Sequence, residues 1–148
     1  MKQKVRFWII GTNIITDQFI QAASHCEAFE LSAVYSRTEA RGQAFAAKYG
    51  VTHIFTDLEE LLTSDVVDAM YIASPNALHA KQAIMCLNYQ KHVLCEKPLA
   101  SNLKEVEAMI AAAKANHVLL MEAMKTTLLP NFKVIQEQLS KIGTVRRY

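Results

Sequence analysis

The stretch that decides the fold is VRFWIIGTNIIT, residues 5–16, in which an apolar run ends at a glycine and a helical pattern begins. This order is typical of the strand, tight turn and helix start of a dinucleotide-binding βαβ unit. A pyrophosphate bound there would lie against unpaired N–H groups of the helix. We therefore assign Gly11, Thr12, Asn13 and Ile14 as candidate cofactor contacts. A strand–turn–helix junction without any ligand is the alternative.

Two positions depart from the usual glycine-rich pattern of this turn. Asn13 stands where a glycine commonly lets the backbone approach phosphate, and Thr16 stands where one commonly lets the helix pack on the strand. Asparagine tolerates positive φ better than most residues. We expect its side-chain amide to be available as a donor to a phosphate.

Outward from this stretch, short β-branched runs alternate with longer segments of helical period. This alternation predicts an α/β fold, a doubly wound parallel sheet of the Rossmann type in three αβα layers. The strands are expected over residues 5–10, 30–35, 53–55, 69–73, 92–95 and 119–121. The helices are expected over residues 14–23, 38–49, 58–63, 77–88 and 103–116.

Two of these helices show a clear apolar face, with residues at i, i+3, i+4 and i+7. The apolar positions are Ala80, Ala83, Ile84 and Leu87 in one helix and Val106, Met109, Ile110 and Ala113 in the other. Thr56 with Glu59, and Asn102 with Glu105, have the spacing of a capping box and predict helix starts.

The composition excludes several classes of function. Sixteen basic and fourteen acidic residues give a net charge of +2, and because the signs are interspersed, we expect no nucleic-acid or membrane-surface partner. No export signal, membrane span or metal-ligand cluster is expected. The three cysteines lack CxxC spacing and lie in apolar stretches, which indicates free thiols in a reducing cytoplasm.

Ser36 and Arg37 follow the second expected strand, where a carboxylate would bind the ribose of NAD. No acidic residue occurs there, whereas a hydroxyl and a guanidinium suit the 2′-phosphate of NADP. We therefore expect NADP or NAD as cofactor, with NADP favoured. The alternative is that Arg37 and Thr38 only solvate and cap the next helix.

The segment Ser74-Pro75-Asn76 follows the fourth expected strand, where the order of the sheet reverses and a crevice opens. Pro75 has no N–H, which leaves Ser74 and Asn76 available to a ligand. Asn76 could equally be the N-cap of its helix. His79, in the first turn of that helix, is a further candidate cofactor contact, although an isolated histidine is more often structural.

Glu96, Lys97 and Pro98 follow the fifth expected strand. Lys97 would face the same crevice as Asn76, where its ammonium could polarise a substrate oxygen while Glu96 sets its charge state. A surface ion pair is the alternative for this pair alone. All four segments fall at the carboxyl ends of strands, so we expect them to line one crevice.

The C-terminal residues predict a last amphipathic helix after Pro130, with Phe132, Ile135, Leu139 and Ile142 facing inward and Gly143 as a left-handed cap. Residues 144–148 then alternate like the start of a strand. A strand without a partner predicts that the chain is a fragment of a longer protein.

These segments together resemble the glucose–fructose oxidoreductase / inositol dehydrogenase family (Gfo/Idh/MocA). The resemblance is carried by Gly11-Thr12-Asn13, Ser36-Arg37, the Ser74–His79 segment and above all His92-Val93-Leu94-Cys95-Glu96-Lys97-Pro98-Leu99. It extends to Met121–Met124 and Leu129-Pro130, and so covers essentially the whole chain.

The resemblance implies a two-domain enzyme that is a homo-oligomer when complete. Residues 1–123 would form the NAD(P)-binding domain, and residues 124–148 would be a linking helix and first strand leading to a substrate domain absent from this chain. It implies that Lys97 lies beside the nicotinamide and that Pro98 follows a cis peptide bond. An Asp and a His for proton transfer would come from the second domain. Thr127 replaces an arginine common in the family.

The function expected is hydride transfer between a nicotinamide and a small-molecule sugar, polyol or related hydroxy or keto compound, with the isolated chain inactive. A non-catalytic NAD(P)-sensing module is the main alternative, and Lys97 beside Glu96 counts against it. A methyltransferase-type domain is a second alternative, but it would have an acidic residue in place of Ser36-Arg37.

Overall fold

The computed structural model describes residues 4–144 and contains a six-stranded parallel sheet. Its order is β3-β2-β1-β4-β5-β6, so the chain winds outward from β1 in one direction and from β4 in the other. The expected reversal between β1 and β4 is confirmed, and all six strands fall within one residue of their predicted bounds at each end. The strands are β1 (Val5–Ile10), β2 (Phe29–Tyr35), β3 (His53–Phe55), β4 (Ala69–Ile72), β5 (His92–Cys95) and β6 (Leu120–Glu122).

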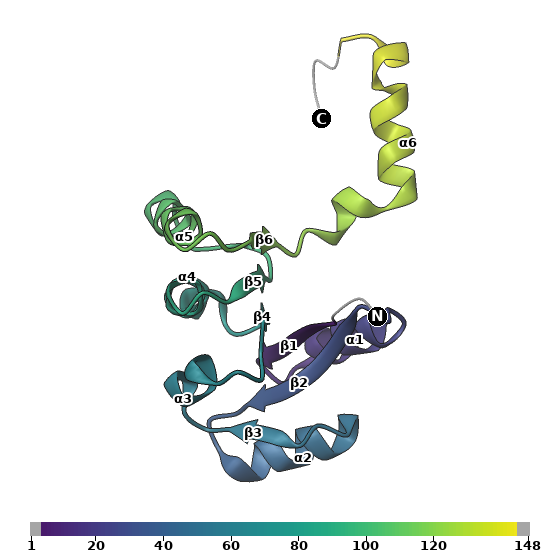
Figure 1. The fold of residues 1–148 in the computed structure, drawn as a ribbon. Coiled ribbons are helices and arrows are strands. Elements are labelled where there is room, and N and C mark those ends of the chain that lie inside the picture. The colour runs from purple at the N-terminus through teal and green to yellow at the C-terminus, as the bar shows by residue number, and fades with distance from the viewer. Residues whose placement is uncertain (1–3, 145–148) are drawn as a thin grey trace.

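Helices cover both faces of this sheet, as the doubly wound prediction requires (Figure 1). One face is covered by α1 (Ile14–Ser24) and α2 (Glu39–Tyr49), and the other by α3 (Leu58–Thr63), α4 (His79–Asn88) and α5 (Leu103–Ala115). The expected three αβα layers are therefore confirmed. Short 3-10 turns also occur, namely η1 (Asn76–Leu78), η2 (Lys125–Leu128) and η3 (Leu139–Ile142).

The core is divided by the sheet into two clusters, because successive strand residues point to opposite faces. In β1, Trp8 packs with Leu61 and Met109 on the face of α3–α5. Its neighbour Ile9 packs with Tyr71 on the face of α1, where the Tyr71 ring stacks on Phe19 with centroids 3.9 Å apart. Each large side chain buried in this way stabilises the fold by roughly 1.5–3 kcal/mol.

The predicted apolar faces hold for α4 and only partly for α5. Met109 and Ala113 are buried, whereas Ile110 is 41% exposed. The reason is position, since α5 covers the β6 end of the sheet and, within residues 4–144, no further helix packs against its outer side (Figure 1).

One of the two predicted helix starts is confirmed and the other is displaced. Asn102 Oδ1 accepts from the Glu105 N–H (3.0 Å) and caps α5 as expected. The cap of α3 is Asp57 rather than Thr56, because its carboxylate accepts from two backbone N–H groups, those of Glu59 and Glu60, at 2.8 Å each. One carboxylate oxygen thus satisfies two of the donors that a helix start leaves free.

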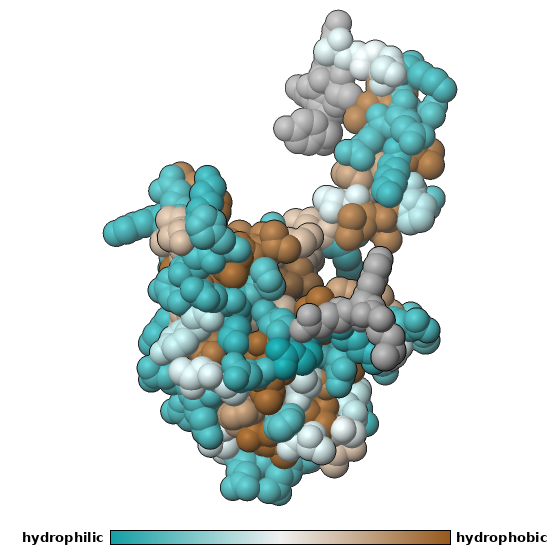
Figure 2. All heavy atoms as spheres, in the orientation of Figure 1, coloured by the Kyte–Doolittle hydropathy of each residue, from teal (hydrophilic) through white to brown (hydrophobic). Residues whose placement is uncertain are grey.

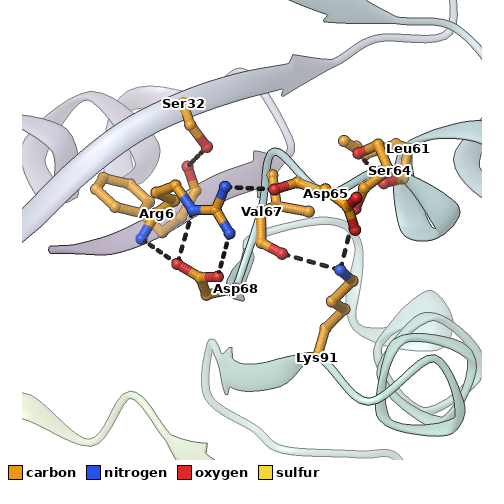
Figure 3. A network of polar contacts seen from close by, with 9 residues as sticks. Arg6, Ser32, Leu61, Ser64, Asp65, Val67, Asp68 and Lys91 are labelled. Carbon is orange, nitrogen blue, oxygen red and sulfur yellow. Dashed lines mark hydrogen bonds and ion pairs between the residues drawn. The ribbon is translucent and has the colours of Figure 1, made fainter. Parts of the chain in front are cut away.

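At the amino-terminal edge of the sheet, charged side chains join three segments that are distant in sequence (Figure 3). Arg6 in β1 donates from Nε (3.0 Å) and Nη2 (2.6 Å) to the Asp68 carboxylate, just before β4. Lys91, just before β5, donates from Nζ to the carbonyl oxygens of Ser64 (3.2 Å) and Val67 (2.9 Å). The hydrogen bond from Arg6 holds the pKa of Asp68 below its ordinary value.

Beyond the sheet, α6 (Pro130–Gln138) projects away from the other helices (Figure 1). The prediction that Ile135, Leu139 and Ile142 face inward is wrong, since they are 58%, 43% and 70% exposed. Amphipathic period predicts an apolar face but not a surface to cover it, and the described residues offer none. Apolar side chains remain visible along α6 and at its junction with the sheet domain (Figure 2).

The end of the chain tests two further predictions only in part. Gly143 has a positive φ of +75°, as a glycine cap requires, but its ψ of −155° is not that of a left-handed helix. The strand expected over residues 144–148 falls almost entirely outside the described residues. Between residues 4 and 144, no helix combines the length and apolar composition that a membrane crossing requires.

Candidate cofactor-binding site

A hollow of about 310 Å³ opens at the carboxyl edge of the sheet, where β1 and β4 diverge. Three of the four segments singled out in the sequence line it, those following β1, β2 and β4. Crevices at such a reversal of strand order are where α/β sheets bind their ligands. The lining residues are Ile10, Gly11, Thr12, Asn13, Tyr35, Ser36, Arg37, Arg41, Ala73, Ser74, Pro75, Leu78 and Gln82.

Gly11 allows the loops after β1 and β4 to approach closely. Its φ is +107°, a value that L side chains rarely adopt, and a Cβ at this position would lie 2.5 Å from the Ala73 carbonyl oxygen. That oxygen belongs to the backbone and cannot move aside without shifting the end of β4. Only glycine fits the turn, as the sequence motif predicts.

The Asn13 side chain lines the hollow and also has hydrogen-bond partners within the protein that the sequence did not predict. Asn13 has an extended backbone (φ −112°) and is the N-cap of α1. Its Oδ1 accepts from the Thr16 N–H (3.2 Å), and its Nδ2 donates to the Ala73 carbonyl oxygen (2.8 Å). The amide thus joins two loops of the protein, which leaves one of its two Nδ2 hydrogens for a phosphate.

Thr16 is accommodated where a glycine was expected for helix packing. Its side chain is fully buried, and its hydroxyl donates to the Gly11 carbonyl oxygen (3.0 Å). Asn13 occupies the Thr16 N–H, and the N–H groups of Ile14 and Ile15, the first two residues of α1, have no hydrogen-bond partner among residues 4–144. These are the donors that a helix N-terminus offers to an anion, although the Ile14 side chain does not line the hollow.

Two guanidinium groups border the hollow after β2. Arg37, which precedes α2, was predicted, whereas Arg41, in the first turn of α2, was missed. Ser36 is buried between them and β3, where its N–H donates to the Phe55 carbonyl oxygen (3.0 Å). Gly42 lets α2 approach this point, because a Cβ there would lie 2.7 Å from Ile54 Cγ2. The lining contains no Asp or Glu to oppose the two cations.

The loop after β4 forms the opposite wall. Ser74 Oγ donates to Gln82 Oε1 (2.6 Å), so this hydroxyl is already engaged by another lining residue. Asn76 is exposed but does not line the hollow, and the N-cap of α4 is Leu78, so the alternative role of Asn76 as that cap is wrong. Leu78 lines the hollow with 43% of its surface exposed and offers an apolar contact.

The fourth segment lies at the same sheet edge but outside the hollow. The Glu96 N–H donates to the Ile72 carbonyl oxygen (2.9 Å), which continues β5 beside β4. The Glu96 carboxylate accepts from the buried Tyr71 hydroxyl (2.6 Å) and from the Lys97 N–H (3.3 Å). Burial, and then this carboxylate, raise the pKa of Tyr71. Lys97 is exposed, and the Lys97–Pro98 peptide is cis.

The surface ion pair considered as the alternative for Glu96 and Lys97 is not formed within residues 4–144. Its carboxylate faces Tyr71 because that hydroxyl, on the neighbouring strand, needs an acceptor inside the core. Cys95, the residue before Glu96, has an unreactive thiol, because burial raises its pKa to about 12.

His79 does not contact the hollow, contrary to the expectation of a cofactor contact. Its side chain is fully buried. Nδ1 lies 2.9 Å from the Pro98 carbonyl oxygen, and Nε2 lies 2.9 Å from the Ser74 carbonyl oxygen. The ring therefore joins the loops that follow β4 and β5.

Six residues that line the hollow were not among the predicted contacts, namely Ile10, Tyr35, Arg41, Ala73, Leu78 and Gln82. Arg41 could have been found, because it lies in the first turn of the helix expected over residues 38–49, at the end nearest the predicted Ser36 and Arg37. Gln82 could be placed in the lining only by knowing that α4 begins at His79, after a 3-10 turn. Between residues 4 and 144, no cluster of three His, Cys, Asp or Glu side chains could hold a metal ion.

The residues present fit a dinucleotide. The Gly11 turn brings backbone close to the hollow, α1 presents free N–H groups, and two guanidinium groups stand where a nucleotide phosphate would need them. The volume of about 310 Å³ is at the lower end of the range for small-ligand sites.

Comparison with known proteins shows the family to which this chain belongs. Residues 5–124 match the family model of Gfo/Idh/MocA oxidoreductases, described as having an NAD-binding Rossmann fold. The scyllo-inositol 2-dehydrogenase (NADP(+)) of Bacillus subtilis is 62% identical over 97% of this chain and 44% of its own length. The 1,5-anhydro-D-fructose reductase of Ensifer adhaerens is 35% identical over 78% of this chain and 34% of its own length.

Solved structures agree with these relatives. A 3-ketoreductase from Actinomadura kijaniata, in complex with TDP-benzene and NADP, has a TM-score of 0.87 and 29% identity over 94% of this chain and 44% of its own. The WlbA dehydrogenase from Bordetella pertussis, in complex with NADH and UDP-GlcNAcA, has a TM-score of 0.86 and 26% identity over 95% of this chain and 41% of its own. The chain spans less than half the length of the relatives described here.

Proposed function

We propose, from the premise that this chain belongs to the Gfo/Idh/MocA oxidoreductase family, that it binds NADP(H) in preference to NAD(H) within an enzyme that interconverts a hydroxyl and a carbonyl group. The observation that carries the preference is the hollow beside Ser36, with Arg37 and Arg41 in its lining and no carboxylate. A 2′-phosphate is doubly charged, and a guanidinium binds it through charge-assisted hydrogen bonds. A carboxylate at that place would repel it.

Each part of the site would then hold one part of the cofactor. The N–H groups at the start of α1 would bind the pyrophosphate beside Gly11. Arg37 and Arg41 would bind the 2′-phosphate, and Leu78 would contact the adenine. The nicotinamide supplies the hydride donor or acceptor when it is bound. Thr12, Asn13 and Ile14 would thus contact the cofactor through backbone atoms rather than through their side chains.

Lys97 would act on the substrate. It follows β5, at the same sheet edge as the hollow, and it forms no ion pair with any residue between 4 and 144. Its ammonium is thus available to polarise the reacting oxygen and to stabilise negative charge that develops there. The substrates printed for the relatives support a sugar, polyol or related hydroxy or keto compound as the substrate class.

The domain division is part of the same proposal. Residues 1–123 would be the nucleotide-binding domain, and residues 124–148 would lead into a region that completes the substrate site and the interface of a homo-oligomer. The greater length of the relatives supports this division.

A cytoplasmic location is part of the proposal as well. Cys86 and Cys95, which are buried free thiols, support it, whereas Cys26 is exposed.

The experiment that tests the cofactor preference is a titration of the chain with NADPH and with NADH. Arg37→Ala should weaken NADPH binding roughly ten- to hundredfold, on the scale of a charge-assisted hydrogen bond, and leave NADH binding nearly unchanged. Lys81→Ala is the matched control, since it removes one exposed cation from α4 outside the hollow. Equal losses for both cofactors would refute the preference. Absence of binding to either would contradict the cofactor role of the site itself.

A further inference from the structure

His79 joins the two loops that enclose the reactive end of the proposed cofactor site. It is the first residue of α4, and its side chain is fully buried. Its two ring nitrogens lie 2.9 Å from two main-chain carbonyl oxygens, that of Ser74 after β4 and that of Pro98 after β5. One side chain thus spans the loop that lines the hollow and the turn that carries Lys97.

We propose that His79 is a positioning residue that sets where Lys97 stands relative to the nicotinamide end of the bound cofactor. This inference rests on the proposed function, because it assumes that a dinucleotide occupies the hollow. His79 itself touches neither cofactor nor substrate. It acts through the Pro98 carbonyl, one residue beyond Lys97.

The turn has few other polar ties to the loop after β4. Glu96 is held by the end of strand β4 and by Tyr71, and Leu99 donates from its N–H to Glu122 Oε1 (2.8 Å) on the far side. Pro98 has no N–H to donate. Within residues 4–144, the hydrogen bonds of His79 are thus the only ones that run from this turn to the Ser74 loop.

The two loops do not depend on His79 equally. Ser74 has a second tie, from its hydroxyl to Gln82 Oε1 (2.6 Å), which holds it to α4 when the ring is removed. The Pro98 carbonyl has no second partner within residues 4–144. Loss of the ring should therefore release the Lys97 turn while the adenosine side of the hollow, formed by Arg37, Arg41 and Leu78, keeps its shape.

The chemistry of the ring makes the bridge testable on its own. Carbonyl oxygens only accept hydrogen bonds, so a ring that bonds to both must carry a proton on each nitrogen. A neutral imidazole would bond to one carbonyl and hold only one of the two loops.

The experiment compares two ligands that share the adenosine half. NADPH carries the nicotinamide, whereas adenosine 2′,5′-bisphosphate lacks it. His79→Ala should weaken NADPH binding about tenfold and change binding of the bisphosphate less than about twofold. The matched control is His92→Ala at the other end of β5, where Nδ1 accepts from the Leu119 N–H (2.9 Å). The control should leave both affinities unchanged, whatever it does to the melting temperature.

The outcomes separate this inference from the proposed function. If His79→Ala weakens the binding of both ligands equally, or weakens neither, the positioning role is overturned. If the wild-type chain binds neither ligand, the proposed function fails instead. In that case, and also if His79→Ala fails to fold, nitrogen-15 NMR of the His79 ring in the wild-type chain tests whether the ring bonds to both carbonyl oxygens. Protons on both nitrogens support the bridge, and one bare nitrogen overturns it.

Discussion

At the amino-terminal edge of the sheet, Arg6 and Lys91 are each held by acceptors of the protein, the Asp68 carboxylate and two backbone carbonyls. At the carboxyl edge, Arg37, Arg41 and Lys97 form no ion pair with any residue between 4 and 144. The same sheet thus uses cations to join segments at one edge and leaves them available at the other. The difference indicates that the first edge serves stability and the second serves binding.

The largest effect should come from the two lysines at the two ends of β5. In the full-length protein, Lys97→Ala should reduce turnover by about 10²–10⁴-fold, the range of a positioned polarising group, and weaken cofactor binding by no more than about tenfold. Lys91→Ala should lower the melting temperature without changing turnover, because Lys91 binds only the Ser64 and Val67 carbonyls. Steady-state kinetics of both variants checks this. Normal turnover in Lys97→Ala would favour the cofactor-sensing alternative.

A smaller effect should distinguish two glycines with positive φ. Gly11→Ala at the carboxyl edge should cost about 2–4 kcal/mol of folding free energy, because the new Cβ would lie 2.5 Å from the Ala73 carbonyl oxygen. Gly50→Ala, after α2, should cost only about 1 kcal/mol, since nothing lies within 4 Å of its Cβ position. Urea unfolding of both variants measures the difference. Equal costs would mean that φ alone, and not the loop contact, requires Gly11.

The smallest effect concerns the Arg6–Asp68 ion pair at the amino-terminal edge of the sheet. Asp68→Asn should cost about 1 kcal/mol at neutral pH, a modest value because the pair is partly exposed. The pKa of Asp68 is lowered in the folded chain, chiefly by its hydrogen bond from Arg6, so this stabilisation is present above its ordinary pKa. It is lost as the pH falls through the lowered value.

Urea unfolding of wild type and Asp68→Asn across the acid range should therefore show the two stabilities converging. Asp65→Asn is the control, because the hydrogen bond from Arg6 to Asp65 goes to the backbone carbonyl and not to the carboxylate. If the free energies of unfolding of wild type and Asp68→Asn differ by the same amount at every pH, the charge of the Asp68 carboxylate is not what stabilises its pairing with Arg6.

The parts of the fold that could be predicted from the sequence are those specified by local patterns. Alternation of strands and helices gives the doubly wound sheet and its reversal, and the requirement for Gly11 follows from its place between a strand and a helix. Lys97 could be placed at the sheet edge because it follows a strand directly.

The partners of polar side chains could not be predicted, since they come from distant segments. The Asn13 amide meets Ala73, sixty residues away in sequence, and the Glu96 carboxylate meets Tyr71 on the neighbouring strand. Neither encounter leaves a trace in the spacing of residues. The outward face of α6 was missed for the same reason, because period identifies an apolar face without saying whether anything covers it.

The single tryptophan of the chain has a practical consequence. Trp8 is fully buried in β1, three residues before Gly11, and its ring lies against Tyr35, which lines the hollow. Indole emission overlaps the absorption of a reduced nicotinamide but not that of an oxidised one. Binding of NADPH should therefore quench the fluorescence of Trp8 by energy transfer, and oxidation of the bound cofactor should restore it. The protein thus carries an optical reporter of the redox state of its own ligand.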